Sequence, residues 1–490
     1  MRKTLRNIIF AVSASSLVIS CGGGGSSNAP APITIAPPGG TSAATSPPVS
    51  GVCSLRARQD WVAARMDEWY LFPETLPVGL DPSGFSTVTD FLNALTAAAR
   101  AQDRDNFFTF ITSIQQENAF FSSGSNAGFG IRIAYDVPGG RAFIAEAFEG
   151  APGLAAGIDR GTELLAIGTN ANDLVTVSSL LASGGPGAVS SALGPSTAGV
   201  TRLFRIRNAN GTNTVSVTRA DFNIEAVSSR YGARIINDGG RRIGYFNLRT
   251  FIATANDQMR TAFADFRAQG ITDFIIDFRY NGGGLVSTAE LLSNLLGGDR
   301  SPGDVLSRTT FRPSRNSNDR TAFFQQQPQS VRPLKIAFIG TRSTASASEL
   351  VMNSLNPFLG VNAALIGTDT SGKPVGQIGL DQAACDDRLR VIAFSTQNSA
   401  NEGFYYSGMA RLMRSSCTAT DDVTRPLGDP QEDSIARAID FIQGRSCTPI
   451  TPAQFSAKPG VSDPSQRGGA REMLTPTAPT PAQREVPGLF

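Results

Sequence analysis

A cluster of small hydroxyl residues stands between an apolar run and a helix-like stretch. Residues 336–339 are typical of a buried strand, residues 343–348 are rich in serine, and Glu349 opens an apolar segment with helical character. A serine at the start of a helix lies beside backbone N–H groups that have no intrahelical partner and can stabilise an oxyanion. The pattern predicts a nucleophilic serine. The residues alone leave the choice open among Ser343, Ser346 and Ser348.

The base that would activate such a serine cannot be histidine, because the chain contains none. This also excludes Cys-His sites and metal sites built on histidine. Lysine is the known substitute, since burial lowers its pKa. The chain has 43 basic residues, and lysine is found among them only at positions 3, 335, 373 and 458. Only Lys335, at a strand entrance, and Lys373, in a glycine-containing turn, lie in sequence that looks folded, so the residues alone leave the base open between these two.

Strand-like and helix-like segments alternate from about residue 225, which is typical of an α/β core that would position these groups. Residues 243–248 and 274–279 are typical of strands, and residues 257–269 and 429–443 have helical spacing. A glycine-rich turn, residues 280–284, follows the second strand. Glycines at a strand end allow close approach to a ligand and present backbone N–H donors.

Three motifs resemble those of the S41 family of serine peptidases, the C-terminal processing peptidases. Residues 277–284, D-F-R-Y-N-G-G-G, resemble the family's D-L-R-x-N-x-G-G motif, and residues 343–349 resemble its S-x-S-x-S-E segment. Residues 370–377, T-S-G-K-P-V-G-Q, resemble T-x-G-K-x-x-x-Q. The resemblance covers roughly residues 110–445. It implies a multidomain protein of mixed α/β and β structure, with an α/β core of the ClpP/crotonase type and strand-rich additions.

The resemblance also implies roles for individual residues. Ser346 is the nucleophile, Lys373 is its base and Gln377 orients the lysine. The oxyanion donors are the N–H groups of Ala347 and of a glycine in the turn, Gly283. No cofactor or metal ion is implied, because the lysine takes the serine proton and two backbone N–H groups stabilise the tetrahedral intermediate.

A region before the core resembles the PDZ domain of processing proteases. It contains G-F-G-I-R-I at 128–133 and A-P-G-L-A-A-G-I-D-R-G-T-E-L-L-A-I at 151–167. The alternative is an unrelated small β domain. The PDZ resemblance implies that a substrate tail adds a strand to a sheet. The carboxylate of the tail would then be received by backbone N–H groups near Phe129, Gly130 and Ile131.

The N-terminus predicts export and a lipid anchor. Basic residues precede an apolar run at 8–19, which ends at Cys21 and a run of glycines. This resembles the lipobox of bacterial lipoproteins, and the alternative is an ordinary signal peptide. We expect Cys21 to be lipidated and the protein to be held on the cell envelope, with the outer membrane favoured. Net charge is +2, and no basic cluster predicts a nucleic-acid partner.

The four remaining cysteines predict two disulfides, because an exported chain with an even number usually pairs them. Three pairings are possible. We favour one bridge within a strand-rich region and a second that ties the two ends of the folded part. The expected pairs are Cys385–Cys417 and Cys53–Cys447.

Changes of composition divide the chain into six expected parts. They are a signal peptide (1–20), a flexible tether (21–52), a helical region (53–120), a PDZ-like domain (121–220), a peptidase core (225–447) and a disordered Pro-rich tail (448–490). We expect a Ser-Lys endopeptidase that cleaves exported proteins after binding their C-terminal tails. The alternative is an inactive, PDZ-type peptide-binding lipoprotein. The sequence does not indicate the oligomeric state.

Overall fold

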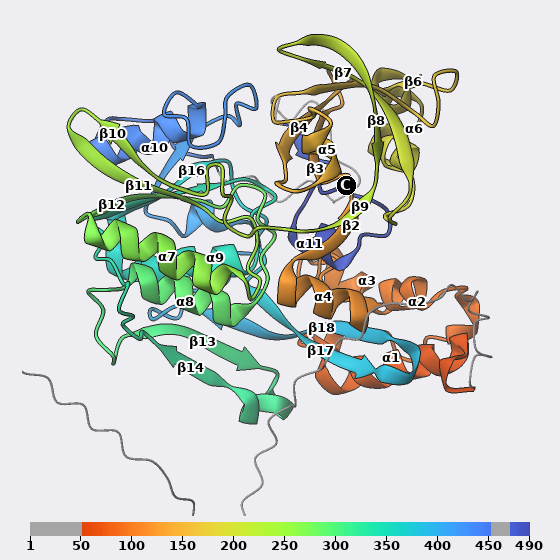
Figure 1. The fold of residues 1–490 in the computed structure, drawn as a ribbon. Helices are drawn as coiled ribbons and strands as arrows, with labels where there is room; N and C mark the ends of the chain where they lie inside the picture. The colour runs from red at the N-terminus through yellow and green to blue at the C-terminus, as the bar shows by residue number, and fades with distance from the viewer. Residues whose placement is uncertain (1–50, 452–470) are drawn as a thin grey trace, which may run out of the picture. The chain divides into compact units, whose positions relative to one another are not determined.

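The computed structural model describes residues 51–451 and 471–490 (Figure 1). The expected signal peptide, Cys21 and nearly all of the tether lie outside these ranges. Within the two ranges, no helix has both the length and the apolar character needed to cross a membrane.

A mostly parallel sheet forms the centre of the α/β part. Its strand order is β10-β11-β12-β15-β16-β19, and β10 is antiparallel to β11 while the other neighbours are parallel. Residues of the central strands are buried on both faces, as their continuous apolar sequences predict. The strands are β10 (Ala233–Asp238), β11 (Arg241–Asn247), β12 (Asp273–Asp277), β15 (Lys335–Gly340), β16 (Ala363–Gly367) and β19 (Ser415–Thr418).

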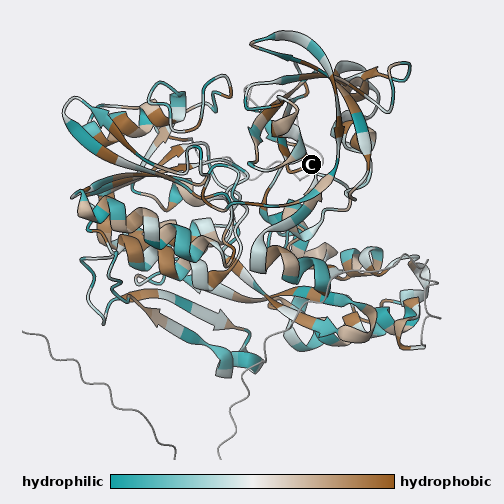
Figure 2. Cartoon of the chain, viewed as in Figure 1, coloured by the Kyte–Doolittle hydropathy of each residue, from teal (hydrophilic) through white to brown (hydrophobic). Residues whose placement is uncertain are grey.

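Helices cover both faces of this sheet. On one face Phe263 of α7 and Met352 of α9 pack in a cluster with Phe274 and Phe338 from the strands. On the other face α10 packs on alternate residues of the same strands, such as Ile275. Figure 1 shows α7, α8 and α9 together below the strands and α10 above them, and the hydrophobic residues of this region are brown in Figure 2. The helices are α7 (Ala255–Ala268), α8 (Val286–Leu296), α9 (Ala347–Leu359) and α10 (Asp433–Gln443).

A second sheet joins the N-terminal helices to the core. Its order is β1-β18-β13-β14, and β17 also pairs with β18. The long hairpin of β17 and β18 packs against α1 and α2 through a shared hydrophobic cluster. The elements are α1 (Leu55–Trp69), α2 (Val88–Leu95), α3 (Ala97–Ala101), β1 (Phe110–Ser113), α4 (Ile114–Ser123), β13 (Val305–Phe311), β14 (Arg320–Phe323), β17 (Val375–Gln382) and β18 (Asp387–Gln397).

A third sheet forms the region that resembles a PDZ domain. Its order is β20-β3-β4-β5-β7-β8, with β6 paired to β5, and helix α6 packs on it. The elements are β3 (Ile131–Asp136), β4 (Arg141–Ala147), α5 (Pro152–Ala155), β5 (Glu163–Gly168), β6 (Val175–Thr176), α6 (Val177–Leu193), β7 (Thr201–Asn208), β8 (Gly211–Thr218) and β20 (Glu472–Met473). A short pair, β2 (Ser125–Gly128) and β9 (Ala220–Asn223), lies at its border.

The predicted fold class, a multidomain protein of mixed α/β and β structure, is confirmed. The prediction of a disordered tail is wrong for residues 471–490. Strand β20 pairs with β3, and helix α11 (Pro481–Glu485) follows it. Burial of apolar side chains stabilises this segment, which its Pro-rich composition did not suggest. The buried side chains are Leu474, Val486, Leu489 and Phe490. Residues 452–470 lie outside the described ranges.

The prediction of two disulfides is confirmed, but the predicted pairing is wrong. The bridges are Cys53–Cys385 and Cys417–Cys447, each with a Cα–Cα distance of 5.5 Å. Cys385 lies in the turn between β17 and β18 and Cys417 lies within β19, which belongs to a different sheet, so the two are separated. Cys53 instead meets the turn between β17 and β18, where Gln382 Nε2 donates to Val52 O (3.3 Å). Thr418 N donates to Thr448 O (2.7 Å), which brings the chain after α10 alongside Cys417.

Candidate active site

The expected nucleophile lies in a strained turn between β15 and α9. Ser346 has φ +54° and ψ −111° and directly precedes the first residue of the helix. A non-glycine residue in such a conformation costs about 1–3 kcal/mol and persists only where its surroundings hold it. Here the Ser346 N–H donates to Glu349 Oε2 at 2.8 Å. Strain of this kind collects at functional sites, and it distinguishes Ser346 from Ser343 and Ser348, which do not have a positive φ.

The hydroxyl of Ser348 has a structural role. This side chain is buried, and its Oγ donates to Asn281 O at 3.2 Å. Asn281 O also accepts from Ala345 N at 3.0 Å. Ser348 therefore ties the start of α9 to the turn after β12, which leaves it poorly placed to act as a nucleophile.

The glycine turn after β12 lies against the start of α9. A Cβ built on Gly283, whose φ is +122°, would lie 2.8 Å from Ser346 Cβ and 3.2 Å from Ala347 N. The two expected oxyanion donors are therefore side by side. The N–H of Ala347 stands at the first helical position, which has no intrahelical acceptor. The N–H of Gly283 donates to Asn281 Oδ1 at 2.9 Å in this structure.

Asn281 is a positioning residue that the sequence analysis did not single out. Its side chain accepts from Gly283 N and donates to Leu248 O at 2.8 Å, and its backbone oxygen accepts from two residues of the serine cluster. It is fully buried. The N of the D-F-R-Y-N-G-G-G segment was the available signal, because a buried amide beside a glycine turn must have several hydrogen-bond partners.

Glu349 joins the serine turn to the lysine turn. Its buried carboxylate accepts from Ser346 N (2.8 Å) and Lys373 N (2.9 Å) at Oε2, and from Gly372 N (2.7 Å) and Thr370 Oγ1 (2.6 Å) at Oε1. Burial raises the pKa of Glu349, and these four donors oppose that rise. One oxygen atom thus contacts the backbone of both Ser346 and Lys373. The sequence placed Glu349 at the start of an apolar, helix-like segment and did not indicate this role.

Lys373 is buried, and its side-chain nitrogen bonds to the residue expected to orient it. Nζ donates to Gln377 Oε1 at 3.0 Å, and Gln377 Nε2 in turn donates to Phe108 O. The Phe108 ring lies 5.1 Å from Nζ. Desolvation lowers the pKa of Lys373, and the carboxylates of Glu485, Asp105 and Glu349 oppose this effect. A buried lysine with a lowered pKa is the group that a Ser-Lys site needs.

The loop expected to receive a carboxylate contacts a backbone oxygen of this chain. Gly130 N and Ile131 N donate to Phe490 O at 2.9 and 3.3 Å. Gly130 has φ +69°, and a Cβ there would lie 2.0 Å from the Ala151 Cβ, so only glycine fits. The Phe129 ring is buried beneath the loop, in edge contact with Phe204. The three expected residues therefore form one surface at the start of β3.

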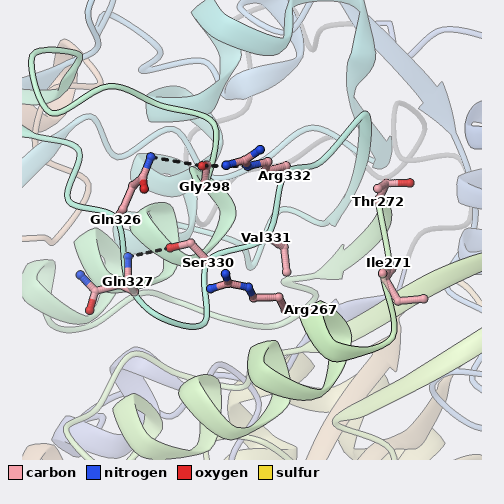
Figure 3. A pocket seen from close by; sticks show the side chains of 10 residues that line it. Arg267, Ile271, Thr272, Gly298, Gln326, Gln327, Ser330, Val331 and Arg332 are labelled. Carbon is pink, nitrogen blue, oxygen red and sulfur yellow. Dashed lines mark hydrogen bonds between the residues drawn. The ribbon is translucent and has the colours of Figure 1, made fainter.

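A separate hollow of about 400 Å³ lies between the end of α7 and the loop after β14 (Figure 3). Gly298 O accepts from Gln326 Nε2 and from Arg332 Nε, both at 3.3 Å, and Gln327 N donates to Ser330 Oγ at 2.9 Å. None of the expected site residues lines it. Its polar groups are largely bonded to one another, which indicates a structural joint rather than a reactive site.

Comparison with known proteins agrees with this arrangement. Residues 242–400 match the model of peptidase family S41, and residues 57–110 match the model of the peptidase S41 N-terminal domain. These two matched ranges are S41 peptidase domains within the chain. The range 242–400 contains the glycine turn, Ser346, Glu349 and Lys373, so the S41 match covers the elements that position the site.

The chain is similar to chloroplastic processing peptidases. It is 27% identical to the C-terminal processing peptidase of Tetradesmus obliquus over 53% of this chain and 54% of that protein. It is 27% identical to carboxyl-terminal-processing peptidase 3 of Arabidopsis thaliana over 55% of this chain and 50% of that protein. The chain thus spans about half the length of the curated relatives it matches.

A solved structure shares the S41 fold. A structure named as an S41 protease from Bacteroides fragilis superposes with a TM-score of 0.62 at 22% identity, covering 78% of this chain and 97% of that one. At this identity the likeness supports the fold alone.

Proposed function

We propose that this protein is a serine endopeptidase that acts on exported proteins through a Ser346–Lys373 dyad. The observation that carries the proposal is the position of Glu349 Oε2, which accepts hydrogen bonds from the backbone N–H groups of both residues. A single buried carboxylate holds a strained serine and a buried lysine in one site. The S41 domain matches and the similarity to processing peptidases point to the same reaction class.

The chemistry follows from the properties of these groups. Neutral Lys373 takes the proton of the Ser346 hydroxyl while Oγ forms a bond to the carbonyl carbon of the substrate. The oxyanion is stabilised by the Ala347 N–H and by an N–H of the glycine turn, for which Gly283 must exchange its bond to Asn281. The leaving amine departs with the lysine proton. Water then hydrolyses the acyl-enzyme and restores the serine.

The proposed substrates are proteins held by their C-terminal tails. The region 121–220 would act as a PDZ-like domain beside a peptidase core at 225–447. The supporting observation is the pair of N–H donors at Gly130 and Ile131, which already bind a backbone oxygen at the edge of β3. A tail bound there adds a strand to the sheet, and its carboxylate takes the two donors.

The proposed location is the cell envelope, with Cys21 as a lipid anchor. The two disulfides support export, because such bonds persist in oxidising compartments and are rare in the cytosol. The run of apolar residues before Cys21 supports a secretion signal that ends at a lipidated cysteine.

The proposal is tested by incubating the protein with an unfolded protein and measuring cleavage. We expect Ser346→Ala to abolish cleavage with little change in the unfolding temperature, because the variant removes one oxygen atom. Ser343→Ala is the matched control and should retain most of the activity. Full activity of Ser346→Ala would show that the nucleophile is another residue.

A further inference from the structure

The segment 481–490 occupies the expected peptide groove in this structure. Its residues 488–490 run along β3, where Ile133 N donates to Gly488 O (2.8 Å) and Phe490 N donates to Ile131 O (2.9 Å). A bridge between Arg132 and Leu489 is antiparallel. Together with the two bonds from Gly130 and Ile131 to Phe490 O, this is the pattern by which a peptide adds a strand to a sheet edge.

Apolar burial fixes the last two residues of this segment. The Phe490 side chain is 2% exposed and packs in the cluster that contains Phe129, Leu181 and Val189, the last two from α6. Leu489 is fully buried in a different cluster, the core cluster that contains Phe274 and Phe338 of the parallel sheet. The segment therefore packs at its end against both the β3–α6 cluster and the core cluster.

The same segment reaches the catalytic turn. Gly282 N donates to Glu485 O at 2.9 Å, and a Cβ on Gly282 would lie 2.8 Å from Arg484 O. The segment thus lies on the glycine turn whose N–H groups are proposed to serve the oxyanion. Arg132 Nη1 bonds to both Pro487 O and Tyr280 O, at 2.7 Å each, which links the segment to the residue that precedes Asn281.

The charge of the segment acts on the proposed base. Among the carboxylates, Glu485 does most to raise the pKa of Lys373 against the effect of burial, although burial also raises the pKa of Glu485, which the charge of Lys373 opposes. A protonated lysine cannot accept the proton of Ser346. Occupation of the turn and stabilisation of the charged lysine both oppose catalysis.

We propose that segment 481–490 is a resident ligand of the peptide groove, that it holds the S41 site inactive, and that substrate tails with bulky apolar ends activate the enzyme by displacing it. This inference rests on the proposed function for its activity readout. The groove would accept a tail with two apolar residues at its end, one for the Phe129–α6 pocket and one for the core cluster.

The expected size of the effect follows from the covalent attachment of segment 481–490 to the chain. A ligand attached to the same chain acts at an effective concentration on the order of 1 mM, so a groove with a Kd of about 0.1 mM would be occupied about ten to one. The apparent affinity for a substrate falls by the fraction of groove that stays open. Displacing the segment should therefore lower KM about tenfold.

The first test replaces both buried end residues. We expect the double variant Leu489→Asp, Phe490→Asp to cleave an unfolded protein with a KM about tenfold lower than that of the unmodified protein. Thr477→Asp adds negative charge to an exposed position of the same tail and should leave KM unchanged. A synthetic peptide with the sequence of residues 481–490 should inhibit the double variant competitively, and a scrambled peptide should not. Wild-type KM in the double variant would overturn the inference.

A second test does not require that variant to fold. In the Ser346→Ala protein, hydrogen exchange at residues 486–490 should be slow and should become at least tenfold faster when the synthetic peptide is added in excess. Unchanged exchange would overturn the inference. This measurement does not depend on cleavage, so it separates the two ideas. If cleavage does not depend on Ser346, the proposed function is wrong. The exchange result still tests, by itself, whether segment 481–490 is a resident ligand.

Discussion

At the scale of single residues, a buried carboxylate connects the parts of the candidate site. Glu349 accepts three backbone N–H bonds and one hydroxyl bond, and two of the N–H groups belong to Ser346 and Lys373. The positive φ of Ser346 is maintained by this arrangement. Glu349 is therefore a positioning residue, whose loss should affect turnover more than substrate binding.

Glu349→Gln tests this role. The amide group replaces an acceptor with a donor that faces backbone N–H groups, so at least one of the four bonds is lost at a cost of about 1–3 kcal/mol. We expect kcat to fall, while KM should stay within about twofold of the value for the unmodified protein. Steady-state kinetics with an unfolded protein would check this. A rise in KM with unchanged kcat would assign Glu349 to substrate binding instead.

Lys373→Arg separates a general base from a structural cation. Arginine stays protonated at any working pH and cannot accept the Ser346 proton, so we expect a loss of ~10²–10⁴-fold in kcat. Lys335→Arg is the control and should be nearly silent, because Lys335 Nζ donates to the carbonyls of Phe441 and Ile442 at 3.3 and 3.1 Å, which an arginine can also do. Wild-type turnover in Lys373→Arg would rule out the dyad.

The pH profile gives an independent check on the same residue. The neutral form of Lys373 is the active one, so kcat should rise as pH rises through the pKa of Lys373 and then level off. Because burial lowers that pKa, the rise should lie below the range of an ordinary lysine. The chain has no histidine that could produce such a rise. Activity that falls over this range would contradict a lysine base.

The expected site residues came partly from their types and partly from the S41 motifs. The absence of histidine and the scarcity of lysine narrowed the base to two lysines, and the motifs singled out Ser346, Lys373, Gln377 and Gly283. In the structure Gln377 bonds to Lys373, and Gly283 lies against Ser346. The positions of Asn281 and Glu349 could not be predicted in detail. Their roles arise from bonds to backbone atoms of distant segments, which only the folded chain brings together.

At the scale of elements, the start of β3 is the feature that gives the molecule a binding surface. Gly130 permits the close approach of Ala151, and the N–H groups of Gly130 and Ile131 point at one oxygen atom. Two converging N–H donors favour a charged carboxylate over a neutral carbonyl, since hydrogen bonds to ionised acceptors are about twice as strong.

Peptides therefore offer a test of the groove. In the Leu489→Asp, Phe490→Asp protein, a peptide with an apolar end and a free carboxylate should bind more tightly than its amidated form. The expected difference is about tenfold, since hydrogen bonds to charged groups contribute about 1.5–3 kcal/mol against about 0.5–1.5 for neutral ones. A fluorescence titration of both peptides measures this. Equal Kd values would argue against a carboxylate site.

The disulfides show why element pairing was hard to predict. The number of bridges followed from the even count of cysteines, but the pairing depends on which strands share a sheet. Cys53 lies 332 residues before its partner, in a short helical turn that docks on the β17–β18 hairpin. The residues on either side of each cysteine do not indicate that these two segments are in contact.

At the scale of the whole molecule, the remaining prediction concerns the N-terminal segment. We expect Cys21→Ser to release the protein from membranes or to block its maturation, because a cysteine thiol is needed to carry a lipid and the Gly-rich stretch that follows has no other apolar anchor. Fractionation of cells that express each form checks this. A normally processed Cys21→Ser protein that stays in the membrane fraction would contradict the lipid anchor.

The whole-molecule arrangement was predicted in outline and missed in one place. The order of helical region, small β region and α/β core follows from composition and periodicity, which are local properties. The position of residues 471–490 does not, because a Pro-rich segment has little structure of its own and is ordered here by β3, α6 and the core. An extended segment that folds only against a partner surface carries little periodic signal.

Segment 481–490 belongs to the same chain as the site that it occupies, so dilution of the protein should not empty the site. A ligand in free solution leaves its site when the mixture is diluted, whereas a ligand in the same chain stays at the same local concentration. The specific activity of the protein should therefore be the same at nanomolar and micromolar enzyme. Cells that make very few copies of the protein would hold it as inactive as cells that make many, and only the supply of substrate tails would set how much of it works.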